Sequence, residues 1–280
     1  MKPINNTVDD LFQPRELAED EYLNEADGLI YCSKCHTPRQ HRIELKERVF
    51  LPTVRCRCQQ EEYDKEEAER KHKEFLLQVS RLKANGLQDK SLHDYNFSND
   101  KGYNPEMQKA HDYVAHWEEM KSKSLGLLLW GDVGTGKSFF AGCIANALLD
   151  KGIPVLMTNF SRILNTLTGM YSDDRNQFID SFNKYSLLII DDLGIERSSE
   201  FALEQVFNVI DSRYRSKKPL IVTTNLTLDE LKHPKDLARA RIYDRVLERC
   251  VHLKINNQNI REVNAAANMQ EARKILNSGT

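Results

Sequence analysis

Short runs of apolar residues alternate with helical patterns in the part of the chain that follows residue 90. Each run has the length of a buried strand, and strands that are covered on both faces by helices form a parallel sheet. Residues 203–214 carry apolar side chains at the i, i+3, i+4, i+7 spacing of an amphipathic helix. The pattern therefore predicts an α/β fold with a five-stranded parallel sheet, whose strands are expected at 125–130, 153–157, 187–190, 220–222 and 251–255.

A highly charged segment precedes this pattern. Residues 60–85 mix acidic and basic side chains without a proline, which indicates an exposed helix with i,i+4 charge pairs. We predict that this helix links two domains; a helix on the surface of the second domain is the alternative. The expected organisation is a small domain at 1–60, a charged linker helix at 61–88 and the α/β domain at 89–280.

Composition and charge narrow the class of protein. The 280 residues are 40% hydrophobic and 29% charged, which is ordinary for a globular protein of more than one minimal domain. A net charge of −2 excludes a histone-like blanket of positive charge but not a local basic groove. No apolar run approaches the roughly 20 residues of a membrane span, and the polar, acidic start of the chain does not read as a secretory signal. We expect a cytoplasmic protein that does not bind a membrane.

The sequence GDVGTGKS at 131–138 matches the phosphate-binding loop G-x-x-x-x-G-K-[ST] between an expected strand and an expected helix. Glycines let successive backbone N–H groups point at one anion, and the helix N-terminus adds partial positive charge. Lys137 can reach the β- and γ-phosphates, and the Ser138 hydroxyl can bind Mg²⁺. The sequence thus predicts binding of ATP with Mg²⁺ by the following residues: Gly131, Asp132, Val133, Gly134, Thr135, Gly136, Lys137, Ser138 and Phe139.

An apolar strand that ends in carboxylates is the second half of such a site. Asp191 and Asp192 follow the run 187–190. We expect Asp191 to hold Mg²⁺ through water and Asp192 to orient the attacking water. Many ATPases carry glutamate at the second position, so the shorter aspartate predicts less well aligned water. Two aspartates that cap a helix are the alternative.

Further polar residues follow the last strands. Asn225 is the polar end of the strand that starts with the apolar run at 220–222, and it could contact the γ-phosphate or the water. Arg241 and Arg245 share one face of an expected helix at 239–249, where they would form either a solvated charged face or an arginine finger for a neighbouring subunit. Arg261, just past the fifth strand, could reach the γ-phosphate of its own subunit.

Together these motifs resemble those of the DnaC/DnaI-type replicative helicase loaders and the IstB-like transposition ATPases, within the AAA+ superfamily. The resemblance covers residues 90–265 and rests on GDVGTGKS, LLIIDDLG, the strand that ends in TTN, the Asp244-Arg245 pair and the short tail with Arg261. It implies an AAA+ P-loop NTPase domain without the full helical lid of most AAA+ proteins.

The resemblance also implies roles for single residues. By it, Walker A consists of Lys137 and Ser138, Walker B of Asp191 and Asp192, sensor 1 is Asn225, the finger is Arg245 and the sensor 2 arginine is Arg261. Arg241, one turn away, is the alternative finger. In the family, assembled subunits line a single-strand channel; Arg162 and Tyr171 are candidate DNA contacts, and ordinary helix surface is the alternative for both.

Four clustered cysteines, Cys32, Cys35, Cys56 and Cys58, offer enough thiolates for a closed tetrahedral zinc site. In a reducing cytosol, such cysteines are more often metal ligands than disulfides. The second pair is one residue closer than C-x₂-C, so His36 or His41 could replace one of them. A redox dithiol and unliganded thiols are the other readings. Zinc modules of this kind dock DnaI-type loaders on the helicase.

The leading hypothesis is an ATP-dependent helicase loader in DNA replication. It would bind a hexameric replicative helicase and single-stranded DNA, assemble into a homo-oligomer with ATP, and use slow, DNA-stimulated hydrolysis as a switch. The main alternative is an IstB-like transposition helper that delivers a transposase to target DNA. A nucleotide kinase is disfavoured by the order of the motifs, and intact Lys137 and Asp191 argue against a regulator with a vestigial ATPase.

Overall fold

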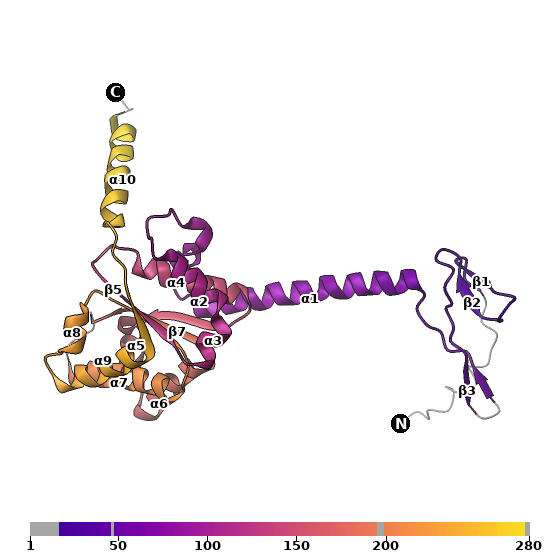
Figure 1. The fold of residues 1–280 in the computed structure, drawn as a ribbon, viewed down its shortest axis with the longest axis horizontal. Helices are drawn as coiled ribbons and strands as arrows, with labels where there is room; N and C mark the ends of the chain where they lie inside the picture. Colours follow the sequence, from indigo (N-terminus) through magenta and orange to yellow (C-terminus); the bar gives the residue numbers. More distant parts are fainter. Residues whose placement is uncertain (1–16, 46–47, 195–198, 278–280) are drawn as a thin grey trace. The chain divides into compact units, whose positions relative to one another are not determined.

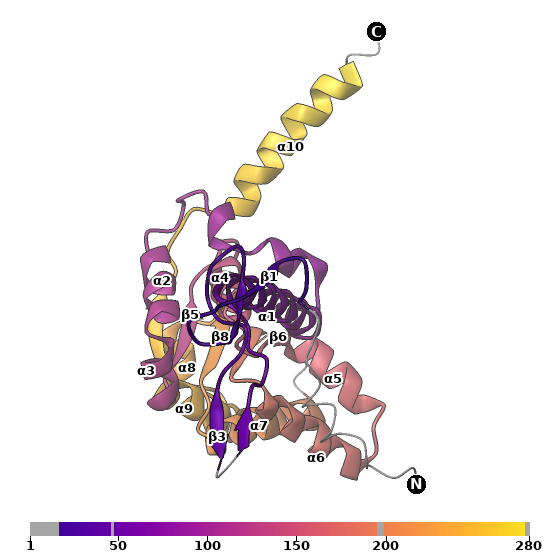
Figure 2. The same ribbon diagram turned by 90° about the vertical axis from the view of Figure 1, so that its right-hand side faces the viewer.

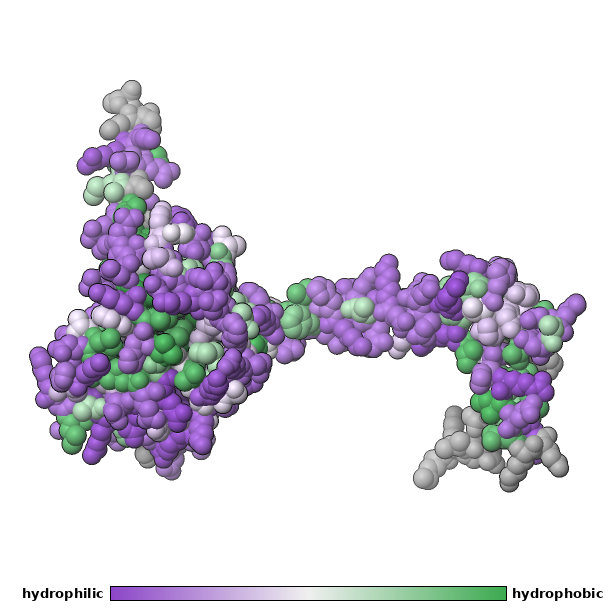
Figure 3. Space-filling view, viewed as in Figure 1, coloured by the Kyte–Doolittle hydropathy of each residue, from purple (hydrophilic) through white to green (hydrophobic). Residues whose placement is uncertain are grey.

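The structure is a computed structural model, which describes residues 17–45, 48–194 and 199–277. The chain divides into two units, residues 1–76 and 77–280. The helix α1 (Arg57–Gly86) contributes to both units and begins earlier than the expected boundary at residue 61. Its surface is mostly hydrophilic (Figure 3), in keeping with its charged sequence.

The larger unit contains the five-stranded parallel sheet that the sequence predicts. The strand order is β6-β7-β8-β5-β9. The strands are β5 (Gly126–Trp130), β6 (Val155–Asn159), β7 (Leu187–Leu193), β8 (Leu220–Thr224) and β9 (Cys250–Lys254). Because the strands are parallel, their carboxyl ends meet at one edge: Trp130 pairs with Thr224 and Lys254, and Asn159 pairs with Asp191.

Helices cover both faces of this sheet (Figure 1 and Figure 2). Side chains of successive strand residues point to opposite faces, so Leu127 and Leu129 pack with α2 and α4, whereas Leu128 packs with α5, α7 and α9. The helices of this unit are α2 (Met107–Ala115), α3 (Trp117–Ser122), α4 (Lys137–Asp150), α5 (Phe160–Thr168), α6 (Ser172–Ser181), α7 (Glu200–Arg215), α8 (Leu228–Lys232), α9 (Leu237–Arg249) and α10 (Ile260–Asn277), with short 3₁₀ turns η2 (Lys90–Asp94), η3 (Phe97–Asn99) and η4 (Phe182–Lys184).

Local sequence explains where several of these helices begin. The side chains of Asn159, Ser199 and Asp236 accept hydrogen bonds from the first-turn backbone N–H groups of α5, α7 and α9. Thr227 and Glu230 form a capping box at the start of α8. The helices expected at 203–214 and 239–249 are thereby confirmed as α7 and α9.

Arg213 of α7 is a buried cation that the apolar periodicity does not reveal. It is 1% exposed and donates to the backbone carbonyls of Pro219, Tyr185 and Ser186 at 2.7–3.1 Å. Burial lowers the pKa of its guanidinium to about 9. These bonds join α7 to the residues just before β7 and β8, and so they fix the position of the helix on the sheet.

The smaller unit contains two short antiparallel hairpins, which precede α1. The strands β1 (Glu21–Leu23) and β2 (Ile30–Cys32) form one, and β3 (Ile43–Leu45) and β4 (Arg48–Phe50) form the other. Among residues 17–45 and 48–76, few apolar side chains are buried, so the hydrophobic core that they form is small. Among the described residues of the whole chain, no helix combines the length and apolar character that a bilayer span requires.

Candidate functional site

The phosphate-binding loop lies between β5 and α4, as expected. Gly134 and Gly136 have φ angles of 80° and 94°, a region that residues with a side chain rarely adopt. Lys137, the first residue of α4, is 5% exposed, and its Nζ donates to the carbonyls of Gly131 at 2.8 Å and Asp132 at 2.7 Å. Burial lowers the pKa of Lys137. A triphosphate would offer this cation charged oxygens in place of its own loop's carbonyls.

Ser138 and Asp191 meet at the carboxyl edge of the sheet. The Ser138 hydroxyl donates to Asp191 Oδ1 at 2.9 Å, and the Thr223 hydroxyl donates to the same oxygen at 2.6 Å. Mg²⁺ prefers a few oxygen ligands and keeps several waters. The adjacent hydroxyl and carboxylate oxygens therefore fit a magnesium site beside the loop.

Asp192 has an unusual backbone conformation for a residue with a side chain. Its φ is 59°, and the pairing of β7 with β8 is interrupted between Ile190 and Leu193. Its backbone N–H donates to Thr223 Oγ1 at 2.9 Å. Burial, followed by the charge of Asp191, raises the pKa of the Asp192 carboxyl. Such strain at one residue is typical of functional sites.

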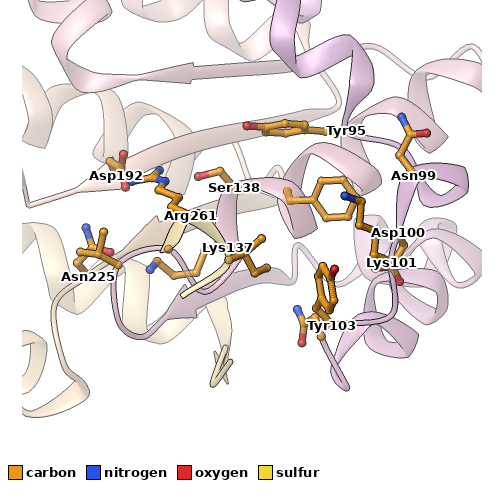
Figure 4. A pocket seen from close by; sticks show the side chains of 16 residues that line it. Tyr95, Asn99, Asp100, Lys101, Tyr103, Lys137, Ser138, Asp192, Asn225 and Arg261 are labelled. Atoms are coloured by element: carbon orange, nitrogen blue, oxygen red, sulfur yellow. The ribbon is translucent and has the colours of Figure 1, made fainter. Parts of the chain in front are cut away.

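One cavity of 490 Å³ brings most of the expected residues together. Its lining includes nine of them: Val133, Gly134, Gly136, Lys137, Ser138, Phe139, Asp192, Asn225 and Arg261. Figure 4 shows Asp192, Asn225 and Arg261 at one end, with Lys137 and Ser138 nearer the middle. The lining does not include Gly131, Asp132, Thr135 or Asp191. Asp191 is, however, hydrogen-bonded to Ser138, which does line the cavity.

The tail of the chain is attached to the loop. The Ile260 N–H at the start of α10 donates to the Gly134 carbonyl at 3.0 Å. This bond holds Arg261, the next residue, at the cavity. A side chain on Gly134 would come within 1.9 Å of Asn259 Oδ1 and would also have to adopt a φ of 80°, which favours glycine at this position.

The opposite wall of the cavity was missed by the sequence analysis. It comes from the segment before α2: Tyr95, Asn99, Asp100, Lys101, Tyr103 and Asn104. Asn146 of α4 ties this wall to the loop helix, because its Nδ2 donates to the carbonyls of Leu92 and Tyr95, both at 2.8 Å. The dense mix of aromatic and amide side chains in YNFSNDKGYN (95–104) is the sequence signal that marks it.

A comparison with family models matches residues 57–267 to the model described as IstB-like ATP binding protein. This match covers more than half of the chain. The chain belongs to the family of IstB-like ATP-binding proteins.

Curated relatives of this IstB-like chain include two replicative helicase loaders. It is 27% identical over 143 residues to DnaC of Escherichia coli (strain K12), which covers 50% of this chain and 56% of DnaC. It is 24% identical over 165 residues to DnaI of Bacillus subtilis (strain 168), which covers 55% and 53%. The chain thus spans about half the length of these relatives. Among solved structures, a crystal structure of DnaI has a TM-score of 0.51 at 23% identity over 61% of this chain and 93% of that chain, a likeness of fold.

Arg245 of this IstB-like chain lies outside the cavity and is bound within its own subunit. Its Nε donates to Asp211 Oδ1 at 2.8 Å, and its guanidinium lies 4.6 Å from the centre of the Phe207 ring. The Arg241 side chain is exposed and has no ion pair within the part of the chain that the structure describes. Of the two candidate arginines, Arg241 is therefore exposed to solvent, whereas Arg245 is paired with Asp211 of α7.

The four cysteines come together in the smaller unit. Their sulfur atoms all lie within 4.8 Å of one another, and among the described residues neither His36 nor His41 belongs to this group. The Thr37 hydroxyl lowers the pKa of Cys35 to about 5, whereas the neighbouring Cys35 sulfur raises the pKa of Cys58 to about 12. Four crowded thiols of this kind fit a zinc ion, which stabilises all of them as thiolates.

The two candidate DNA contacts differ in their surroundings. Arg162 donates to the Gln88 carbonyl at 3.0 Å, so part of its hydrogen-bonding capacity is used within the subunit. Tyr171, between α5 and α6, is 85% exposed. An exposed ring can stack on a base, so Tyr171 is free to do so, whereas Arg162, which is also exposed, spends part of its hydrogen-bonding capacity on Gln88.

Proposed function

We propose that this chain is an ATP-dependent helicase loader in DNA replication, which binds a hexameric replicative helicase and single-stranded DNA. The observation that carries the proposal is the pairing of Ser138 with Asp191 beside Lys137, a set suited to Mg²⁺ and a triphosphate. The likeness to DnaC and DnaI supports loading as the use of that site. A transposition helper is not favoured, because these named relatives are loaders.

ATP binding and hydrolysis follow from the chemistry of the residues. Lys137 would leave the two carbonyls of its own loop and pair with phosphate oxygens. Magnesium, bound by Ser138 and Asp191, would neutralise charge on the transferred phosphate. Asp192 would accept the proton of the attacking water or orient it, and Asn225 and Arg261 would contact the γ-phosphate end.

Replacing Asp192 by asparagine tests its role. Asparagine tolerates a positive φ, so we expect the variant to fold and to bind ATP at least as tightly as the wild type. Its DNA-stimulated hydrolysis should fall by about a hundredfold, because the water loses its base. Steady-state phosphate release and ATP titration measure both quantities. Unchanged hydrolysis would remove Asp192 from the proposed site.

The same variant makes a prediction about stability and pH. Because folding raises the pKa of Asp192, its ionised form is disfavoured in the folded protein. The neutral asparagine should therefore raise the melting temperature at pH 8, and this gain should vanish as the pH falls toward about 4, where the aspartate is also protonated in the unfolded chain. A thermal melt series without nucleotide measures the difference. An equal gain at both pH values would speak against a charge effect.

We also propose Arg245 as the finger that completes a neighbouring subunit's site in an ATP-bound oligomer, with Asp211 holding it in the isolated chain. Arg245→Ala should bind ATP normally but lose DNA-stimulated hydrolysis, and mixing it with Lys137→Ala should restore part of the rate. Asp211→Asn is the matched control, since it breaks the same ion pair yet keeps the arginine and the stimulated rate. If Arg241→Ala shows the complementing behaviour instead, Arg241 is the finger.

The smaller unit is proposed to carry zinc on Cys32, Cys35, Cys56 and Cys58 and to dock on the helicase as a domain at 1–60, linked by the helix at 61–88 to the ATPase domain at 89–280. Size-exclusion chromatography with the hexameric helicase of the same genome tests this proposal. The wild type should co-elute with the helicase, and Cys32→Ser should not. Co-elution with a transposase and not with the helicase would favour the transposition helper.

A further inference from the structure

The cavity beside the phosphate-binding loop is larger than the triphosphate chemistry requires. Its 490 Å³ lies in the range of pockets that hold whole small molecules. Figure 4 shows Asn99, Asp100, Lys101 and Tyr103 at the end away from Asp192, Asn225 and Arg261. With phosphates at the loop and the γ-phosphate end near Asp192, the nucleoside falls toward this second end.

Aromatic rings make this end suitable for a flat heterocycle. Tyr103 lies at this end, and Tyr95 lines the middle of the cavity near Ser138 (Figure 4). The Tyr95 ring meets Phe139 edge-on at 5.5 Å between centroids. Tyr95 also packs closely on α4, where a side chain at Gly142 would come within 2.5 Å of Tyr95 Cβ. The Tyr95 ring is therefore held in place by the helix that also carries Lys137.

Asn104 is the buried polar side chain of this wall. It is 7% exposed, and its Oδ1 accepts a hydrogen bond from the backbone N–H of Glu106 at 3.0 Å. Because an N–H group must meet an oxygen, this bond determines which amide atom is Oδ1 and which is Nδ2. Pro105, the next residue, restricts the backbone of Asn104 as well. The amide is therefore held in one orientation.

The other end of the same amide is unsatisfied. Within the described part of the chain, Nδ2 of Asn104 is buried and has no hydrogen-bond partner. Buried donors without an acceptor are rare in folded proteins and destabilise them. Oδ1 already accepts one hydrogen bond, whereas Nδ2 makes none, so the group that Asn104 lacks is an acceptor.

We propose that Asn104 is a specificity-determining residue of the nucleotide site, which donates from Nδ2 to a ring nitrogen of the nucleobase. The inference rests on the proposed function, since it requires that the loop bind a nucleoside triphosphate. Adenine presents three unprotonated ring nitrogens, N1, N3 and N7, as acceptors of this kind. The base, and not the phosphates, then supplies what the buried amide lacks.

Asn104→Asp separates this role from a structural one. Aspartate keeps the Oδ1 bond to Glu106, because it caps as well as asparagine, but it replaces the donor by an acceptor. Calorimetric titration of the full chain with Mg²⁺ compares ATP with inorganic tripolyphosphate. We expect the ratio of the ATP affinity to the tripolyphosphate affinity to fall at least about tenfold below its wild-type value. The added charge acts on both ligands and cancels in the ratio.

Asn96→Asp is the matched control, since it adds the same charge to the same segment but does not line the cavity. Its Oδ1 accepts hydrogen bonds from the Ser98 hydroxyl and the Asn99 N–H, which aspartate keeps. It should leave the ratio of ATP to tripolyphosphate affinity unchanged. Equal weakening of both ligands by Asn104→Asp, or the same change of the ratio by Asn96→Asp, would overturn the proposal.

Deaza analogues of ATP identify the acceptor. We compare 1-deaza-, 3-deaza- and 7-deaza-ATP, each of which lacks one ring nitrogen. One of them should bind the wild type about tenfold more weakly than ATP does. For that analogue, Asn104→Asp should cause no further loss of affinity relative to tripolyphosphate. If all three analogues lose affinity in the variant by the same factor as ATP, Asn104 does not contact a ring nitrogen. A wild type that binds neither ATP nor tripolyphosphate would refute the proposed function itself, which is a distinct outcome.

Discussion

Lys137→Ala is expected to weaken ATP binding by about a thousandfold, the loss of two or more charge-assisted hydrogen bonds. Lys137 is buried at the start of α4, and its Nζ already lies between two carbonyls of the loop that would receive the phosphates. Arg261 lines the same cavity but belongs to its γ-phosphate end, so it should replace little of this interaction. Titration with a fluorescent ATP analogue measures the change.

Lys101→Ala is the control for this prediction. Lys101 also lines the cavity, at its other end, and its side chain is exposed. Its loss should change the affinity for ATP by only a few fold. A Lys137→Ala variant that binds ATP as tightly as Lys101→Ala would contradict the assignment of the loop.

Cys32→Ser is expected to abolish zinc binding and to unfold the smaller unit. About one zinc ion per chain should co-purify with the wild type, and none with the variant. The described residues of this unit bury few apolar side chains beyond Ile30 and two of its cysteines, so we expect the metal to supply most of the unit's folding free energy. Limited proteolysis should cut the variant within residues 1–60, while the α/β unit stays folded and still binds ATP.

His36→Ala is the matched control for the metal site. His36 is exposed, follows Cys35 in the chain and is not part of the four-sulfur group. Its variant should keep the full zinc content, measured by mass spectrometry of the metal. Full zinc content in Cys32→Ser, or its loss in His36→Ala, would show that the ligand set is wrong.

The five strands and the helices α7 and α9 could be predicted because their signals are local. The phosphate-binding loop is a contiguous motif, and each strand is a short segment rich in apolar residues. The boundaries were less accurate. The second strand begins at Val155 rather than 153, and the third continues through Asp191 and Asp192 to Leu193.

The features that sequence reasoning missed depend on contacts between distant residues. Asp211 and Arg245 lie on different helices, so no regular spacing in the sequence predicts their ion pair. The wall at Tyr95 and Asn104 has no motif, and it reaches the loop through packing against Gly142 and hydrogen bonds to Asn146. The positive φ of Asp192 likewise arises from an interrupted strand pairing that only the assembled sheet contains.

Helicase loading on closed circular single-stranded DNA tests the proposed function most directly. A circle has no end to thread, so a ring-shaped hexamer must be opened to enclose it. We expect the wild-type chain with ATP to raise the amount of salt-resistant helicase on such circles at least about tenfold, and Lys137→Ala to give no increase. An equal amount of bound helicase with wild type, with Lys137→Ala and with no added chain would contradict the assignment as a loader.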